Sequence, residues 1–234
     1  MVDNETTTRE QRWLTSTWPF VREHLPPPPG QILEIGCGPL GGFVPALRSE
    51  GYDAIGIDPE APEGSDFQRT EFERHEVTRP PDAVVACTSL HHVADLADVV
   101  GRIASALVPG GTLVVVEWAW ERFDENTAKW CFEHVPADGA DDHPSWLQRH
   151  REDWAASGQS WTSYLRGWVH EERMHSGLDI VRALRARFDT HLLTDGTYFF
   201  ADLDGVTPAS EQDAIDARHI NACGIRYVGQ ARTV

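Results

Sequence analysis

Residues 32–42 of the chain read ILEIGCGPLGG, an apolar run followed by a glycine-rich turn. The run Ile32–Ile35 predicts a buried strand, and residues 43–50 after the glycines are expected to form a short helix. Glycine lets the backbone adopt positive φ and approach a bound ligand closely. Asp58 ends the next apolar run, 20 residues after Gly38, where an acid can accept hydrogen bonds from ribose hydroxyls. The stretch therefore predicts a nucleotide-binding turn between a strand and a helix.

Two cofactor classes fit this turn. Gly36, Gly38 and Gly41 match GxGxxG, a pattern typical of dinucleotide-binding proteins that is weak evidence on its own. Glu34 favours the other class, because nicotinamide and flavin proteins normally have an apolar strand residue at this position. An acid there suits a cationic ligand such as S-adenosylmethionine (SAM), which carries an ammonium and a sulfonium group. SAM is therefore the preferred cofactor, and a nicotinamide-dependent oxidoreductase stays as the alternative.

The rest of the chain alternates between apolar runs and helical patterns. Such alternation predicts an α/β fold with a Rossmann-like, doubly wound sheet. Strands are expected at 54–57, 72–77 (a weaker candidate), 83–87, 113–116, 197–200 and 225–228. Helices are expected at 11–25, 95–107, 209–222 and 178–188, the last from an apolar stripe of Leu178, Val181, Leu184 and Phe188.

Four parts follow from this pattern. We expect an N-terminal helical lid with a proline-rich connector at 1–29, a SAM-binding core at 30–117, a helical cap insertion at 118–175, and the remaining helices and strands of the core at 176–234.

Charge and composition exclude several partners. The chain has 234 residues, with 37 acidic and 20 basic side chains and a formal net charge of -17, and its only lysine is Lys129. Nucleic acid and anionic membrane surfaces need basic clusters, so neither is expected to bind. The four cysteines form no CxxC pair, the N-terminus lacks an apolar signal core, and no apolar run approaches the ~20 residues of a spanning helix. A cytoplasmic protein, monomeric or homodimeric, is expected.

Five blocks in order resemble the class I SAM-dependent methyltransferases of the small-molecule, UbiE-like type. They are LEIGCGPLGG (33–42), GIDPE (56–60), VVACTSLHHVADL (84–96), LVPGGTLVVVEW (107–118) and GIRYVGQ (224–230). The chain departs from the family pattern where Leu40 replaces the last glycine of the turn. The resemblance implies a seven-stranded sheet whose last strand is antiparallel. It also implies methyl transfer from SAM to a small organic acceptor, with S-adenosylhomocysteine (SAH) as product.

The resemblance also assigns cofactor-binding residues. Glu34, Gly36, Cys37 and Gly38 should lie beside the methionine part of SAM, and Asp58 should hold the ribose. The segment HEV (75–77) would place Glu76 and Val77 near the adenine. The remaining cofactor positions follow the fourth strand, where Cys87 and Thr88 should border the sulfur and His92 should pack on the cofactor.

Two residues are candidates for general base catalysis. His91 follows the fourth strand and Glu117 ends the next one, so both are expected at the same edge of the sheet. In related small-molecule O-methyltransferases, residues at these positions act as a base and its orienting acid. An alternative is that the LHHV segment is a feature of the fold, with His91 capping the following helix. An amine acceptor would need no protein base.

Seven of the nine tryptophans lie between residues 118 and 168, inside the expected cap. Most of these rings are expected to build the core of the cap, because aromatic residues are strong core formers. Trp118 and Trp120 directly follow the active edge and are the candidates for substrate contact, together with Trp13 and Trp18 of the N-terminal helix. An aromatic or apolar acceptor is therefore expected. No metal site is predicted, and a SAM-binding module without transferase activity stays open as an alternative.

Overall fold

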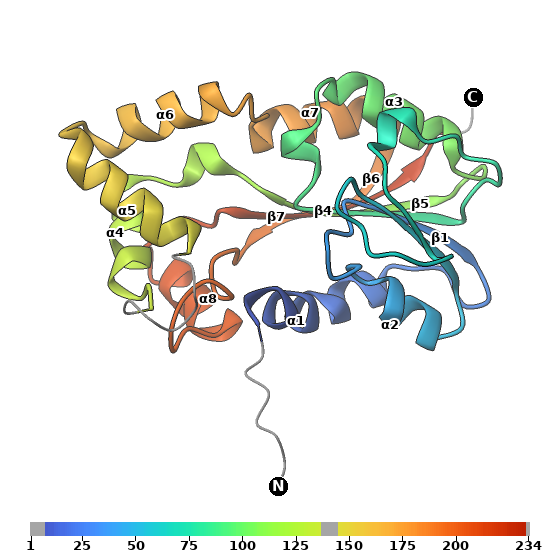
Figure 1. Ribbon diagram of the computed structural model, residues 1–234, viewed down its shortest axis with the longest axis horizontal. Helices are drawn as coiled ribbons and strands as arrows, with labels where there is room; N and C mark the ends of the chain where they lie inside the picture. Colours follow the sequence, from blue (N-terminus) through green and yellow to red (C-terminus); the bar gives the residue numbers. More distant parts are fainter. Residues whose placement is uncertain (1–7, 137–144, 233–234) are drawn as a thin grey trace, which may run out of the picture. The chain divides into compact units, whose positions relative to one another are not determined.

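The computed structural model describes residues 8–136 and 145–232 and contains a seven-stranded sheet. The strand order is β3-β2-β1-β4-β5-β7-β6. Figure 1 draws the ribbon of the sheet with its helices. The strands are β1 Gln31–Ile35, β2 Asp53–Ile57, β3 Phe67–Gln68, β4 Ala83–Cys87, β5 Thr112–Trp118, β6 Phe188–Gly196 and β7 Gly224–Ala231. The last strand is antiparallel. The predicted Rossmann-like α/β fold is confirmed.

Helices connect these strands. The α-helices are α1 Arg9–Glu23, α2 Val44–Ser49, α3 Leu96–Ala106, α4 Glu125–Glu133, α5 Trp146–Ser157, α6 Trp161–Glu171, α7 Gly177–Arg187 and α8 Pro208–Asp216. Short 3-10 turns are η1 Phe72–Arg74, η2 Leu90–His92 and η3 Trp120–Arg122. Several helices begin at a side-chain cap, as in α3, where the Asp95 carboxylate accepts a hydrogen bond from the main-chain N–H of Asp98 at 3.0 Å.

Parallel pairing aligns the carboxyl ends of the central strands at one edge of the sheet. In the register, Ile35 of β1 faces Ile57 of β2, and Cys87 of β4 faces Val116 of β5. The residues that follow each strand therefore gather at this edge, where open α/β sheets bind ligands. The glycine turn, Asp58 and the η2 turn all start there.

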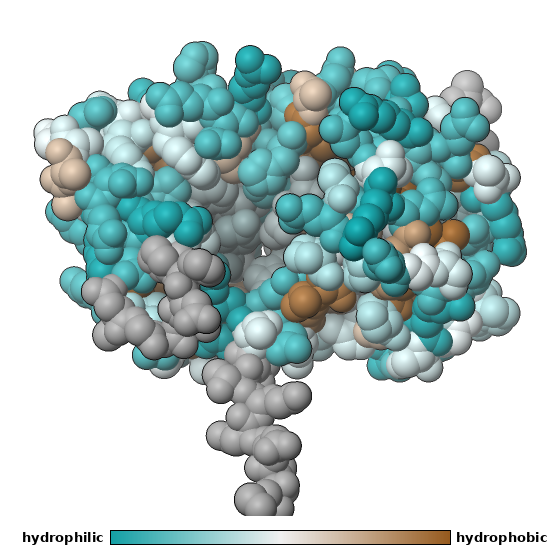
Figure 2. All heavy atoms as spheres, viewed as in Figure 1, coloured by the Kyte–Doolittle hydropathy of each residue, from teal (hydrophilic) through white to brown (hydrophobic). Residues whose placement is uncertain are grey.

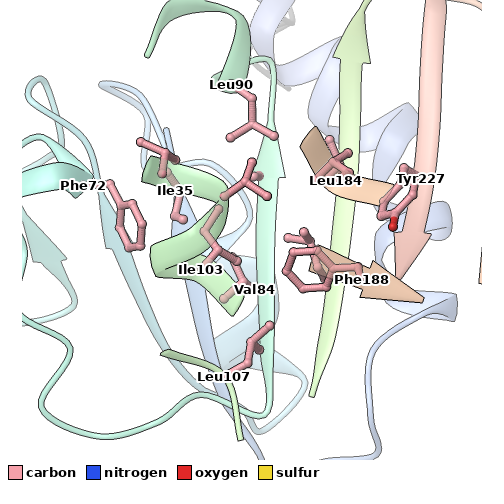
Figure 3. Packing of buried hydrophobic residues seen from close by; sticks show 14 of the residues in the cluster. Ile35, Phe72, Val84, Leu90, Ile103, Leu107, Leu184, Phe188 and Tyr227 are labelled. Carbon is pink, nitrogen blue, oxygen red and sulfur yellow. The ribbon is translucent and has the colours of Figure 1, made fainter. Parts of the chain in front are cut away.

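One face of the sheet packs against α3 and α7. Apolar side chains of the strands meet those of the two helices in a single buried cluster (Figure 3). Ile103 of α3 and Leu184 of α7 are fully buried in it, and Leu90 of η2 is anchored in the same cluster. Burial of each such side chain stabilises the fold by roughly 1.5–3 kcal/mol. The cluster thus holds η2 down on the sheet.

The structure corrects several predicted elements. The strand expected at 72–77 is wrong, because β3 is only Phe67–Gln68 and residues 72–74 form η1. The strand expected at 197–200 is also wrong, since β6 already ends at Gly196. In the helix expected at 178–188, Leu178 is 62% exposed and Phe188 begins β6. The helix expected at 209–222 ends at Asp216. The two wrong strands were short elements in which apolar residues fit a strand and a helix equally well, whereas the two helices were wrong only in their bounds or in the residues of their buried face.

The chain divides into two compact units. The sheet unit comprises residues 18–119, 174–195 and 225–234, and the helical unit comprises residues 1–17, 120–173 and 196–224. The four-part division expected from the sequence stays a prediction.

In the helical unit, α4, α5 and α6 pack together. The core of the helical unit is largely aromatic. Trp161 is completely buried, its Nε1–H donates to the carbonyl of Phe123 at 2.6 Å, and its ring meets that of Phe123 edge-on. The predicted role of the tryptophans as core formers is borne out for Trp161, whereas Trp130, Trp146, Trp154 and Trp168 are only half-buried.

The visible surface is mostly hydrophilic (Figure 2), as expected for a strongly acidic chain. Within residues 8–136 and 145–232, no helix is both long and apolar enough to cross a bilayer.

Candidate active site

The glycine turn after β1 has a backbone that other residues adopt poorly. Gly36 and Gly38 have φ of 78° and 64°, in the left-handed region that favours glycine. A Cβ on Gly36 would lie 2.4 Å from the Cβ of Ser89, which follows β4. The Gly36 N–H donates to the carbonyl of Ile57 at 2.8 Å. The turn therefore lies close against the ends of both neighbouring strands.

Asp58 is held in place by two backbone donors. Its Oδ2 accepts a hydrogen bond from the N–H of Gly38 at 3.1 Å, and its Oδ1 accepts one from the N–H of Glu60 at 2.7 Å. The carboxylate is half-buried, so its remaining lone pairs can still accept hydrogen bonds from a ligand. The predicted ribose-binding acid is thus oriented beside the glycine turn.

A pocket of about 380 Å³ opens at this edge of the sheet unit. Four of the predicted cofactor residues line it, namely Gly36, Asp58, Thr88 and His92. Ile35, Ile57 and Phe72 add an apolar wall, and Glu71, Glu73 and Ser89 add polar groups. This volume lies within the range of small-molecule sites.

The pocket fits SAM chemically as well as in size. The Oγ of Ser89 is buried and has no hydrogen-bond partner in the described part of the chain, so it can bind a polar group of a ligand. Asp58 offers acceptors for hydroxyls, and the apolar wall suits the flat face of a purine. These residues could therefore hold SAM, and their roles in binding it stay predictions.

Thr88 and the two cysteines near the pocket differ in accessibility. Thr88 lines the pocket with φ of 51°, which is uncommon for a residue other than glycine. Cys87 is 4% exposed, and burial, followed by the nearby charge of Glu34, raises the pKa of its thiol. Cys37 is also buried and packs against Gly56 of β2. Neither thiol lines the pocket and both are packed as small side chains, so their contact with SAM stays a prediction.

Glu34 binds the backbone of its own turn. Both carboxyl oxygens accept the main-chain N–H of Phe43, at 3.0 and 2.8 Å, just where α2 begins. Burial raises the pKa of Glu34 to about 8, although the backbone donors of Phe43 and Val44 act in the opposite direction. Glu34 is only 3% exposed and is not among the residues lining the pocket. Its contact with the ammonium of SAM stays a prediction.

The acid expected near the adenine depends on where the third strand ends. Glu76 is exposed and does not line the pocket, and Val77 packs against the buried cluster instead. Glu71 and Glu73 do line the pocket, because the chain turns after the short β3 strand rather than after residue 77. Sequence reasoning missed them, since it placed the third strand too late. The adenine role of Glu76 stays a prediction, and the geometry favours Glu71 or Glu73.

His91 and Glu117 form a short, buried pair. The His91 Nδ1 lies 2.6 Å from the Glu117 Oε2, and the two residues are 4% and 0% exposed. Glu117 accepts three further hydrogen bonds. They come from the backbone N–H groups of Ser89 and Leu90, at 2.8 and 2.6 Å, and of Trp118, at 3.0 Å. The structure thus brings the two predicted catalytic residues together.

The environment of Glu117 determines where the proton lies on His91. Burial alone would raise the pKa of Glu117, but His91 and the backbone donors outweigh it and lower the pKa below its ordinary value. An ionised carboxylate only accepts, so the Nδ1 of His91 must carry the proton. A neutral His91 then has a bare Nε2, which can accept a proton from a substrate.

His92 lies beside this pair and differs from it. Its ring centroid is 4.1 Å from that of His91, its side chain is exposed, and it lines the pocket. Desolvation, and then the neighbouring His91, lower the pKa of His92. A neutral imidazole on the wall suits packing against a cationic cofactor.

The predicted substrate tryptophans fall in both units. In the sheet unit, Trp118 is 3% exposed and meets the His91 ring edge-on at 6.3 Å, and Trp18 stacks on Phe43 at 5.9 Å. In the helical unit, Trp13 and Trp120 are half-buried. Substrate contact by all four tryptophans stays a prediction.

Comparison with known proteins identifies the family of the chain. Residues 9–162, more than half of the chain, match the family described as "Methyltransferase domain". The chain belongs to this methyltransferase family. Its sequence is 27% identical, over 138 residues, to the ubiquinone biosynthesis O-methyltransferase of Bradyrhizobium sp. (strain ORS 278). That match covers 53% of this chain and 51% of the relative, so the chain spans about half the length of the curated relative that it matches.

Solved methyltransferases share the fold. A SAM-dependent methyltransferase from Mesorhizobium loti superposes with a TM-score of 0.54 at 16% identity, covering 92% of this chain and 97% of that one. The N-methyltransferase NodS from Bradyrhizobium japonicum, solved with SAH, gives 0.53 at 12% identity, covering 99% and 91%. The family and fold are those of class I SAM-dependent methyltransferases, and SAM is the cofactor of this class. The nicotinamide alternative is therefore excluded. Among the described residues, no group of three ligating side chains forms a metal site.

Proposed function

We propose that this methyltransferase transfers the methyl group of SAM to a hydroxyl group, or else an amine, of a small aromatic or apolar metabolite, with SAH as product. The observation that carries the proposal is the buried His91–Glu117 pair beside the cofactor pocket. A hydroxyl is the better acceptor for this site, because it must lose a proton and the pair supplies a base for it. The curated O-methyltransferase relative supports this choice.

When bound, SAM would supply an electrophilic methyl group on its sulfonium, and the neutral thioether of SAH would be the leaving group. The Nε2 of His91 would take the proton of the acceptor hydroxyl as the oxygen of that hydroxyl attacks the methyl group. Glu117 keeps the Nδ1 proton in place and stabilises the imidazolium that forms, as the orienting acid does in other histidine bases. Gly36 and Asp58, which line the pocket, would position the cofactor relative to this base.

Turnover of simple probes tests the proposal. The protein is mixed with SAM and either catechol or benzylamine, and SAH formation is measured. We expect transfer to catechol, and we expect His91→Ala to lower it by on the order of 10²-fold while SAH affinity, measured by calorimetry, stays near that of the wild type.

Transfer to benzylamine alone, unaffected by His91→Ala, would contradict the base role. Tight SAH binding without transfer to any of a panel of phenols, alcohols and amines would instead favour a SAM-binding module without transferase activity.

A further inference from the structure

His175 makes two hydrogen bonds to the segment that carries the proposed base. It lies in the sheet unit, just before α7. Its main-chain N–H donates to the carbonyl of His91 at 3.0 Å, and its ring Nε2 lies 2.9 Å from the carbonyl of Val93. Because a carbonyl only accepts, the Nε2 must donate and carries a proton. Neutral and cationic rings can both do this, so the contact does not need a charged histidine.

These bonds go to backbone carbonyls in the second half of η2 and just after it, where Glu117 accepts no backbone N–H. Glu117 fixes the start of the turn by accepting the N–H groups of Ser89 and Leu90. The Ser89 side chain makes no capping hydrogen bond to η2. At the other end, the chain leaves η2 at Val93, which is extended and lines the cofactor pocket. A single 3-10 turn has little stability of its own, so its ends must be held from outside.

We propose that His175 is a positioning residue, which fixes the end of η2 so that the His91 ring stays in hydrogen-bond contact with Glu117. The proposal rests on the function proposed above for His91. His175 does not touch the reacting atoms. Its ring acts through the backbone of Val93, and this is the bond that a substitution removes, because the main-chain bond to His91 survives any side-chain change. Small displacements of a catalytic group lower turnover strongly.

The test compares His175→Phe with His175→Gln. Phenylalanine keeps the ring but removes the donor, whereas the glutamine amide can place a donor near the former Nε2. The first readout needs no acceptor: the proton NMR resonance of the His91 Nδ1–H, which a bond of 2.6 Å shifts far downfield. We expect His175→Phe to move this resonance upfield and to speed its exchange with water by about tenfold or more, and His175→Gln to restore both.

The second readout is turnover of a probe that the wild type methylates. We expect His175→Phe to lower kcat by about tenfold with little change in KM, and His175→Gln to recover most of it. His134→Phe is the matched control, because it also removes a bond between a histidine ring and a carbonyl, that of Trp130 at 2.8 Å, within the helical unit. The control should leave the His91 resonance and kcat unchanged.

The proposal is overturned if His175→Phe keeps the wild-type resonance, or if phenylalanine and glutamine perturb it equally. If His175→Phe does not fold, His175→Asn replaces it, since the shorter amide does not reach Val93 and should behave as predicted for phenylalanine. Failure of the proposed function has a different signature. His91→Ala would then turn over normally, while the resonance of the His175 variants would still decide the positioning role.

Discussion

Glu34 and Glu117 both lie one residue before the end of a parallel strand but differ in charge. Each is the penultimate residue of a parallel strand, β1 or β5, and each is almost completely buried. Burial raises the pKa of Glu34 to about 8, whereas the pKa of Glu117 is lowered despite its burial. The difference lies in the partners: among the described residues, the donors to Glu34 are backbone N–H groups, whereas Glu117 also has His91.

This comparison shows that burial alone does not determine the role of an acid. Leu33 and Ile35 point into the cluster with α3 and α7, so the alternation of a strand turns Glu34 to the opposite face, toward α2. Glu117 lies on the same face of β5 as Leu113 and Val115, which belong to that cluster. The η2 turn places His91 on this face. An uncharged Glu34 clamps the glycine turn, and an ionised Glu117 orients a base.

The largest expected effect comes from removing the charge of Glu117. Glu117→Gln presents an amide whose N–H can donate to His91 Nδ1, which would move the ring proton to Nε2 and block its function as a base. We expect turnover to fall by about 10²-fold or more. Steady-state kinetics with catechol, compared with the wild type, measures this loss.

Glu211→Gln controls for the structural damage. Glu211, in the helical unit, is also buried and accepts the backbone N–H groups of Tyr198, Phe199 and Phe200. A glutamine amide at either position would place its own N–H group against a backbone N–H group, so the structural damage should be similar. A turnover loss as large in Glu211→Gln as in Glu117→Gln would show that the effect is only a loss of stability.

An intermediate effect is expected in the glycine turn that follows Glu34. Gly36→Ala puts an alanine at a backbone position with positive φ, which residues other than glycine rarely adopt. It also places the new Cβ 2.4 Å from the Cβ of Ser89. The backbone cost alone is about 1–2 kcal/mol, and the overlap narrows the pocket. We expect SAH affinity, measured by calorimetry, to fall by about tenfold or more.

Gly158→Ala is the matched variant for this prediction. Gly158 has φ of 64°, and nothing lies within 4 Å of its would-be Cβ. It should lose a similar amount of stability and keep SAH affinity. Equal affinities in Gly36→Ala and the wild type would mean that the turn does not approach the cofactor.

The pH dependence of stability separates the two acids directly. The pKa of Glu34 is raised from 4.5 to about 8 on folding, so its contribution is complete below pH 4.5 and is lost as pH rises toward 8. Glu117 has the opposite sign, because its lowered pKa makes its contribution complete above pH 4.5 and lost at lower pH. Urea unfolding from pH 4.5 to 8 should therefore show that the stability advantage of the wild type over Glu34→Gln shrinks as pH rises, since the other titrating groups are common to both proteins. Parallel profiles for the two proteins would contradict the raised pKa.

The sequence predicted the parts of the site that depend on local pattern. The strand, glycine turn and acid of residues 32–42 and 58 have strong local signals, and parallel topology then brings His91 and Glu117 to one edge. It could not predict the face of the strand to which Glu34 points, because that depends on register with the buried cluster. It missed Glu71 and Glu73, because a two-residue strand gives almost no periodic signal. The contacts of His175 join segments about 80 residues apart, and no local pattern marks such contacts.

The tautomer of His91 tests the central claim most directly. The claim is that an ionised Glu117 holds the proton on Nδ1 and leaves Nε2 free to accept one. Nitrogen-15 NMR of labelled histidine, recorded over a pH series, distinguishes a protonated from a bare ring nitrogen. The account predicts a protonated Nδ1 and a bare Nε2 for His91. A bare Nδ1 with a protonated Nε2 would contradict it.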